Sequence, residues 1–218
     1  LGVPDKDSTW LELDKVLDRV YIFGDGNGLK VRRTFIDSGG HYTAAVYEYC
    51  KRSFAKQRFA IKGQGGPGIA LNHKIGKATG SNLPLVMLGV DDGKQQIMNR
   101  LAVEDVGARY FHFPLDEDDF PNRGYDELYF KGIISEHKKA VKRNGQIREV
   151  WETTQGVRNE PLDLRVYNLA CMQSCHPDWV TLKRLLDGGT EKSAAIAANK
   201  KAQPKKHCGK VSRGANIW

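Results

Sequence analysis

Two aspartates in this sequence stand where rigid backbone would hold a carboxylate in a cleft. Asp37 ends a run of β-branched and aromatic residues and precedes Gly39 and Gly40, whereas Asp163 falls in the first turn of an expected helix. Cleavage of a phosphodiester by two metal ions needs carboxylates that converge on a pair of hard cations about 4 Å apart. From residue type alone, each also has an ordinary interpretation: Asp37 as a turn former and Asp163 as an acid facing a helix dipole.

Periodic apolar residues outline the backbone that would hold these side chains. We expect helices near residues 9–20, 43–54, 97–101, 125–137, 161–172 and 179–185, and strands near 29–36, 58–61, 85–90, 110–113 and 147–151. Residues 62–68 are too rich in glycine for regular structure, and 63–80 form a long basic segment, either a flap against DNA or a surface loop. Strands that alternate with helices predict an α/β domain, a mixed sheet flanked by helices, over residues 1–188.

The positive charge of the chain is concentrated near its C-terminal end. The formal net charge is +8, and residues 191–218 carry seven Lys or Arg against one Glu. We expect residues 189–218 to be a basic, flexible tail that reaches an acidic partner, although lysines that only keep a tail soluble give the same pattern. No apolar run approaches the roughly 20 residues that span a bilayer, which predicts a soluble intracellular protein without a membrane partner.

Four cysteines at irregular spacing predict reduced thiols rather than a disulfide framework. Cys171, Cys175 and His176, with His207 and Cys208, have the residue types of a zinc site, but the first group falls in an expected helix and the second in the tail. Small buried side chains are the other interpretation of these cysteines. The sequence contains no phosphate-binding loop of the Gly-x-x-x-x-Gly-Lys-Ser/Thr type, so no ATP site is expected in this chain.

Four blocks of sequence, in the same order, resemble the large subunit of lambda-like phage terminases. They are Phe35–His41 with Val46, Tyr47 and Ala60–Gly63; Val90, Asp91 and Lys94; Phe111–Pro114; and Trp151, Gly156, Arg158–Asp163, Val166, Tyr167, Leu169 and Ala170. Together the blocks extend over about residues 30 to 170, and the first and last are the most specific. The resemblance implies a ribonuclease-H-like nuclease domain from the C-terminal portion of the large subunit.

The resemblance also implies a site for two Mg²⁺ or Mn²⁺ ions held by carboxylates. By motif, Asp37 corresponds to the second acidic ligand of the family and Asp163 to the last. Asp91 follows a strand and is either a further metal ligand or a cap for the next helix. The side chains expected to contact DNA phosphates, with solvated lysines as the alternative, are Lys62, His73, Lys74, Lys77, Lys94 and Arg158. Further neighbours of the expected site, each with an ordinary structural role as the alternative, are His41, Asn159 and Glu160.

In one respect the sequence departs from this family. The family's first catalytic aspartate lies on an opening strand, before a segment that resembles Leu1–Pro4, and no residue of this sequence matches it. We therefore expect a fragment that begins inside the nuclease domain and lacks its first strands and the ATPase domain. Such a piece is expected to cleave DNA weakly or not at all on its own.

The expected function is metal-dependent cutting of concatemeric double-stranded viral DNA during genome packaging in the host cytoplasm. By resemblance, the other partners are the terminase small subunit, the portal of the procapsid, and the rest of the large subunit with its ATPase domain. The alternative, favoured by the unmatched aspartate, is a catalytically inert module of the packaging motor that grips DNA or docks on the portal.

Overall fold

The centre of the molecule is a four-stranded mixed sheet. The computed structural model describes residues 6–22, 28–114, 124–143 and 145–187, and the predicted tail, 189–218, lies outside these ranges. The sheet order is β3-β4-β6-β5. Strands β3 (Thr34–Asp37), β4 (Arg58–Gln64) and β6 (Pro84–Gly89) run parallel, and β5 (Asn72–Lys77) pairs antiparallel with β6 at the edge. The mixed α/β class predicted from the sequence is confirmed.

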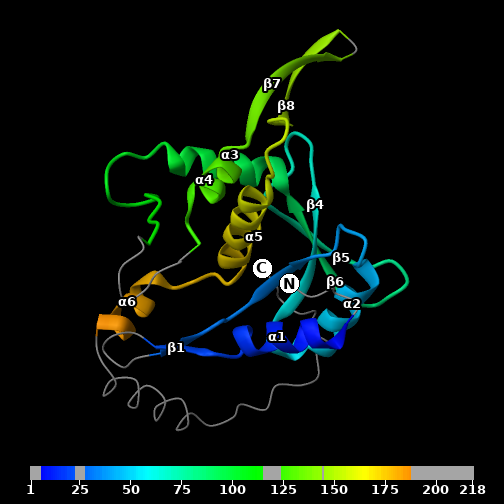
Figure 1. Cartoon of the computed structure of the whole chain (residues 1–218), viewed down its shortest axis with the longest axis vertical. Coiled ribbons are helices and arrows are strands. Elements are labelled where there is room, and N and C mark those ends of the chain that lie inside the picture. Colours follow the sequence, from blue (N-terminus) through cyan, green and yellow to red (C-terminus); the bar gives the residue numbers. More distant parts are fainter. Residues whose placement is uncertain (1–5, 23–27, 115–123, 144, 188–218) are drawn as a thin grey trace, which may run out of the picture.

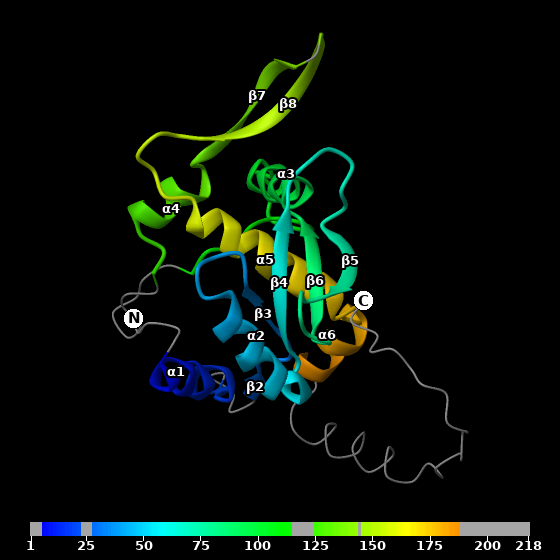
Figure 2. The same ribbon diagram turned by 90° about the vertical axis from the view of Figure 1, so that its right-hand side faces the viewer.

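Helices cover both faces of the sheet, because buried apolar side chains alternate between the faces along the two central strands (Figures 1 and 2). One face packs against α3 (Val90–Leu101) and α5 (Glu160–Ser174), and its buried residues are Phe59, Ile61, Leu71, Val86, Leu88, Ile97, Leu162, Val166, Leu169 and Ala170. The other packs against α1 (Asp7–Leu17) and α2 (Thr43–Arg52), and its buried residues are Trp10, Val46, Tyr49, Cys50, Ala60, Ala78, Leu83 and Leu85.

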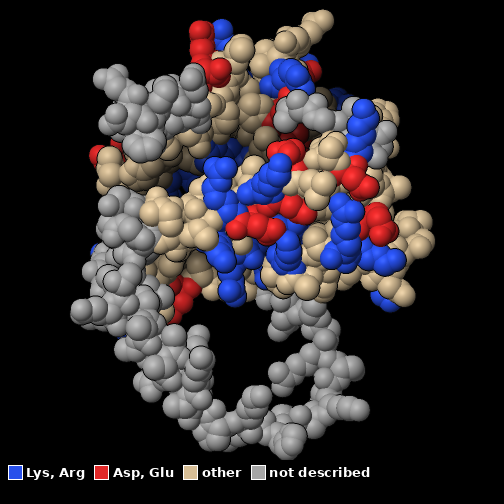
Figure 3. Space-filling model, turned by 60° about the horizontal axis from the view of Figure 1, so that its bottom comes forward, with Lys and Arg blue, Asp and Glu red and all other residues tan. Residues whose placement is uncertain are grey.

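A buried arginine fixes α1 against the sheet. The side chain of Arg58, only 3% exposed, forms ion pairs with Asp14 and Asp18 of the α1 region and donates a hydrogen bond to the hydroxyl of Tyr49. Tyr49 in turn stacks on Trp10 at a ring-centroid distance of 4.3 Å. Around this network the surface mixes the two signs of charge, as Figure 3 shows for the underside of the molecule.

Smaller elements surround this body. They are β1 (Val20–Ile22) paired with β2 (Gly28–Lys30), the 3-10 turn η1 (Phe54–Lys56), α4 (Glu127–Ile133), β7 (Glu136–Arg143) paired with β8 (Gln146–Thr153), and α6 (Trp179–Asp187). The β7–β8 hairpin rises away from the body, next to the end of the sheet at which β3, β4 and β6 finish (Figures 1 and 2). No helix in the described ranges is long and apolar enough to cross a bilayer.

The structure corrects several element predictions between residues 29 and 80. The expected strand 29–36 is two strands, β2 and β3, separated by residues 31–33. Residues 62–64 continue β4, because their pairing with residues 87–89 of β6 outweighs the conformational freedom of Gly63. Within 63–80, residues 72–77 form an edge strand rather than a flap or a loop. Its outer positions are exposed and polar, so it lacked the apolar pattern of a strand.

Two more predictions fail where aromatic and apolar side chains pack outside the sheet. Residues 110–113 are not a strand: Phe111 stacks on Phe113 at 5.4 Å, and both rings lie against the guanidinium of Arg165 on α5. The helix expected over 125–137 ends at Ile133, and Glu136 already begins β7. The predicted strand 147–151 and the helix 161–172 are confirmed within β8 and α5.

Candidate functional site

Asp37 and Asp163 meet beyond the ends of the parallel strands. Asp37 is the last residue of β3, and Asp163 lies in the first turn of α5, one helical turn before Tyr167. The hydroxyl of Tyr167 donates to Oδ2 of Asp37 at 3.3 Å, and the amide of Gly39 donates to Oδ1 at 2.8 Å. Parallel strands of α/β sheets end at the edge where such proteins usually bind ligands.

A second group of side chains holds Asp163 from the other side. Asn159 donates from Nδ2 to Oδ2 of Asp163 at 3.2 Å and to Oε1 of Glu136 at 2.7 Å. Lys94 lies 2.6 Å from Oε2 of Glu136 and 3.9 Å from Oδ1 of Asp163. The Lys94 and Glu136 side chains are 11% and 3% exposed. We refer to Asp37, Lys94, Glu136, Asn159, Asp163 and Tyr167 together as the carboxylate site.

Two glycines permit the close packing on which the carboxylate site depends. A Cβ atom on Gly93 would lie 2.5 Å from Val166, so only glycine lets α3 bring Lys94 this close to α5. A Cβ atom on Gly63 would lie 2.8 Å from Val90 and 3.7 Å from the hydroxyl of Tyr167. The glycine-rich stretch therefore contributes packing at the site as well as a turn.

The charges of the site act on one another. Burial raises the pKa of Asp163, and the negative charges of Glu136 and Asp37 raise it further, against the opposite effect of Lys94. Burial and the charges of Asp37 and Asp163 also raise the pKa of Tyr167, so its phenol stays a neutral donor to Asp37. The site thus concentrates negative charge that the buried Lys94 offsets only in part.

The raised pKa of Asp163 gives a testable effect of pH on stability. With a folded-state pKa above the ordinary value of 3.8, its ionisation opposes folding at neutral pH, and this cost disappears as the pH falls through the raised pKa. Without divalent metal, Asp163→Asn is therefore expected to melt above the wild type at about pH 7, with a smaller gap at about pH 4. Melting curves in EDTA measure this difference, and a variant that melts below the wild type at neutral pH would contradict it.

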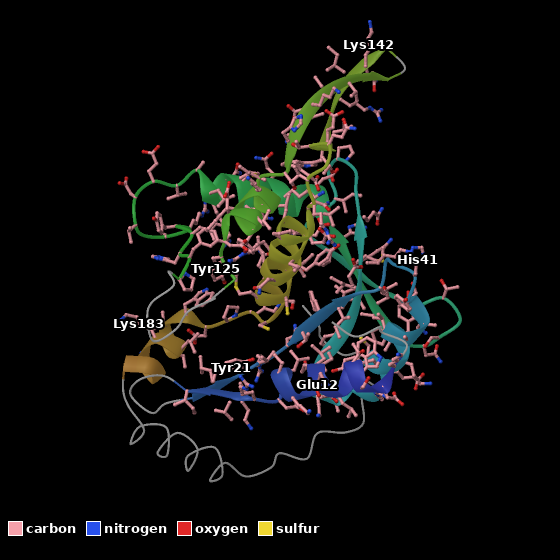
Figure 4. All side chains as sticks on the ribbon, in the orientation of Figure 1. Glu12, Tyr21, His41, Tyr125, Lys142 and Lys183 are labelled. Carbon is pink, nitrogen blue, oxygen red and sulfur yellow. The ribbon has the colours of Figure 1, made fainter. Side chains whose placement is uncertain are left out.

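The other predicted site residues lie in five different places. Asp91 sits in the first turn of α3, where Oδ2 accepts the amide of Gly66 at 2.8 Å, so its carboxylate fastens the glycine-rich loop. Arg158 is 86% exposed and pairs with Glu160 at 2.6 Å, beside the start of α5. Lys62 is exposed on β4. Three residues predicted to contact DNA lie on the edge strand β5: His73, Lys74 and Lys77. Two strands separate β5 from β3, which carries Asp37. His41 points away from the body in the loop after β3 (Figure 4).

Sequence reasoning missed Glu136 and Tyr167. Tyr167 follows Asp163 by four positions on one helix, a spacing that places both side chains on the same face and that was available from the sequence. Glu136 carried no such signal. It was expected inside a helix, and only the tertiary fold brings the start of β7 to Lys94 and Asn159.

Carboxylate oxygens are the donors that Mg²⁺ and Mn²⁺ prefer, and a divalent cation between Asp37 and Asp163 would favour the ionised form of Asp163, whose pKa burial raises first and neighbouring negative charges raise further. Within the described ranges, however, no three His, Cys, Asp or Glu side chains are gathered closely enough to form a complete metal cage. The two aspartates therefore fit part of a hard-cation site.

The zinc site considered from the sequence involves Cys171. Burial raises the pKa of its thiol to about 12, which disfavours the thiolate form that binds zinc. His207 and Cys208 lie outside the described residues.

Comparison with known proteins assigns the chain to a family. Residues 1–182 match the family described as "Terminase large subunit gpA, endonuclease domain", and the chain belongs to that family. It is 28% identical over 206 residues to the terminase large subunit of Escherichia phage lambda, covering 92% of this chain and 31% of that protein. It is 23% identical over 184 residues to the terminase large subunit of Enterobacteria phage P21, covering 82% of this chain and 28% of that protein. The chain thus spans under a third of the length of these relatives. No solved structure matches it.

Proposed function

We propose that this chain is a metal-dependent endonuclease domain that cuts double-stranded DNA at the carboxylate site during packaging of a phage genome. The observation that carries the proposal is the meeting of Asp37 and Asp163, distant in sequence, beyond the ends of the parallel strands, with Tyr167 bonded to one and Asn159 to the other. Membership of a terminase endonuclease family supplies the substrate class.

Each side chain of the carboxylate site has a role in this proposal. Asp37 and Asp163 would hold Mg²⁺ or Mn²⁺, which when bound activates water and offsets charge on the scissile phosphate. Tyr167 keeps one oxygen of Asp37 in place through its hydroxyl. Asn159 and Lys94 orient Asp163. Glu136 in turn holds both of these side chains, because its carboxylate accepts a hydrogen bond from Asn159 and pairs with Lys94. Positioning groups of this kind contribute roughly 10–100-fold to metal affinity or activity.

The wider setting of the site is proposed by the same family relationship. Acids beyond the parallel strands of a mixed sheet with helices on both faces suit a ribonuclease-H-like fold, which we propose for this domain. As part of a large subunit, the domain would act with an ATPase domain, the terminase small subunit and the portal of the procapsid in the host cytoplasm. Lys62 and Arg158, exposed on β4 and before α5, would contact DNA phosphates near the cut.

A second function is favoured by one observation. Because no three-acid metal cage forms among the described residues, the domain would also suit a module that grips DNA for the packaging motor without cutting it. Such a module would shift a plasmid in a gel whether or not metal is present, and would leave it supercoiled.

Nicking of supercoiled plasmid separates the two functions. With the 218-residue chain at high concentration, slow formation of open-circular product is expected in Mn²⁺ or Mg²⁺ and none in EDTA, because two of the expected acidic ligands are present and the family's first aspartate is unmatched. Binding of the plasmid in the same samples, measured by gel shift, is the internal control. A shifted but uncut plasmid in both metals would favour the gripping module, and cutting that continues in EDTA would overturn the metal-dependent mechanism.

A further inference from the structure

The β7–β8 hairpin is a long ribbon that pairs with no other strand in the described ranges. Its two eight-residue strands are in register from Glu136 opposite Thr153 to Arg143 opposite Gln146. At about 3.4 Å per residue the arm is some 25 Å long. It stands clear of the body in two perpendicular views (Figures 1 and 2), and most of β8 is exposed. A lone two-stranded ribbon buries too little apolar surface to form a core of its own, so most of its surface is open to contact with another molecule.

Charge is distributed unevenly along this arm. Near its base, Lys138 pairs with Glu149 at 3.1 Å and Lys139 with Glu152 at 2.8 Å, so these basic side chains are already neutralised. The outer half, residues 140–148, contains three basic residues and no acidic one. Lys142 points outward near the tip (Figure 4), and Ile147 beside it is 76% exposed. Net positive charge thus lies at the end of the arm farthest from the body.

The base of the arm is built into the carboxylate site. Glu136, the first residue of β7, accepts hydrogen bonds from Lys94 and Asn159, and Asn159 also bonds Asp163. The amide of Thr154 donates to the carbonyl of Ser135 at 2.7 Å, which closes the ribbon at this end. A molecule held along the arm is therefore held at a fixed position relative to Asp163.

A groove of about 1050 Å³ separates the arm from the body. Lys138, Arg148 and Trp151 line it from the arm, and the glycine-rich loop 66–70 lines it from the body. Arg148 forms no ion pair among the described residues, and its guanidinium bonds only the side chain of Gln146 at 3.0 Å. One basic side chain of the outer half thus faces this groove while Lys142 faces solvent.

We propose that the outer half of the β7–β8 arm grips the backbone of double-stranded DNA and directs the duplex across the carboxylate site. The inference rests on the proposed nuclease function. A two-stranded ribbon fits the major groove of B-DNA, which is about 12 Å wide, and the cations flanking Ile147 suit phosphates on either side of that groove. DNA is a more suitable occupant than an acidic protein, because the chain belongs to a terminase endonuclease family and the arm stands beside the site proposed to cut DNA.

The test measures affinity for a fluorescent duplex of about 30 base pairs in EDTA over a range of salt concentrations. Lys142→Ala/Arg148→Ala in the full chain is expected to raise Kd about tenfold and to reduce the salt-dependence slope by about two. The matched control, Lys6→Ala/Lys51→Ala, removes the same charge from exposed positions on the α1 and α2 side and is expected to change Kd less than about twofold. Both arm side chains are exposed, so circular dichroism should report unchanged folding.

An arm variant with the Kd and salt slope of the wild type would overturn the inference, as would an equal loss of affinity in the control. Binding of an acidic protein with no loss of DNA affinity in the arm variant would overturn it as well. Asp163→Asn distinguishes this failure from failure of the proposed function, because it is expected to bind the duplex normally and not to cut. If it cuts while the arm variant binds weakly, the nuclease site assignment fails and the DNA-binding arm stands.

Discussion

Asp163→Asn is expected to reduce metal-dependent nicking of supercoiled plasmid by more than about a hundredfold, because positioning groups around metal ligands already contribute roughly 10–100-fold. Asparagine keeps the size of the side chain and an oxygen that accepts from Asn159, but it removes the negative charge that would hold a cation. Asp37→Asn is expected to cause a loss of the same order, since its carboxylate is the other half of the pair. Rates of open-circle formation in Mn²⁺ measure both.

Asp91→Asn is the matched control for these two substitutions. Its carboxylate also lies near the sheet edge but is bonded to the amide of Gly66 in the glycine-rich loop. It is expected to retain nicking within about tenfold of the wild type. Thermal shifts provide a readout besides activity: Mn²⁺ should raise the melting temperature of the wild type and of Asp91→Asn, but not of the other two variants. Full nicking by either Asp37→Asn or Asp163→Asn would exclude the carboxylate site as the nuclease centre.

The sequence predicted those helices and strands in which burial requires apolar residues at a regular spacing. Apolar residues on both faces of β6 form a continuous run at 85–90, which predicted a strand. A proline at the start of α5 and apolar residues at helical spacing predicted a helix there. Even there the boundaries moved, since Val90 belongs to α3. Strand β5 was not readable, because it is an edge strand whose exposed residues are polar.

Interactions between distant segments explain the other errors. The aromatic residues 110–113 have strand-like composition, yet they gather around Arg165, which also donates to the hydroxyl of Tyr129 at 2.5 Å. A cation surrounded by four rings is a tertiary contact that no local pattern encodes. Strand β7 was not predicted from the sequence, because its lysines and Glu136 resemble the polar face of a helix.

The site divides in the same way. Asp37 and Asp163 had the strand-end and helix-start positions that carboxylate chemistry uses, but an aspartate at either position more often has an ordinary turn or helix-start role, and only the family resemblance joined them. Lys94 was expected at a DNA phosphate, and the structure instead places its ammonium in a nearly buried pair with Glu136. Burial of a lysine follows from packing of α3 on α5 at Gly93, which depends on contacts far apart in sequence.

That buried pair carries the largest expected effect on stability. Among the described residues, Lys94→Met leaves Glu136, whose side chain is 3% exposed, with Asn159 as its side-chain hydrogen-bond donor and no paired positive charge. Breaking a buried ion pair by removal of one partner costs about 3–5 kcal/mol, whereas replacing both partners is often nearly neutral. We expect Lys94→Met to lose free energy of unfolding in that range, about 3–5 kcal/mol, in urea melts at neutral pH.

Restoring neutrality should recover most of this loss. In Lys94→Met/Glu136→Gln the amide oxygen of residue 136 still accepts from Asn159, and no charge is buried, so the double variant is expected within about 1.5 kcal/mol of the wild type. Lys62→Met, an exposed lysine on β4, controls for the loss of a lysine and should change stability by less than about 0.5 kcal/mol. Equal instability of Lys94→Met and the double variant would mean that the two charges are not coupled. Recovery of stability without recovery of nicking would instead indicate that Lys94 is retained to orient Asp163 rather than to stabilise the fold.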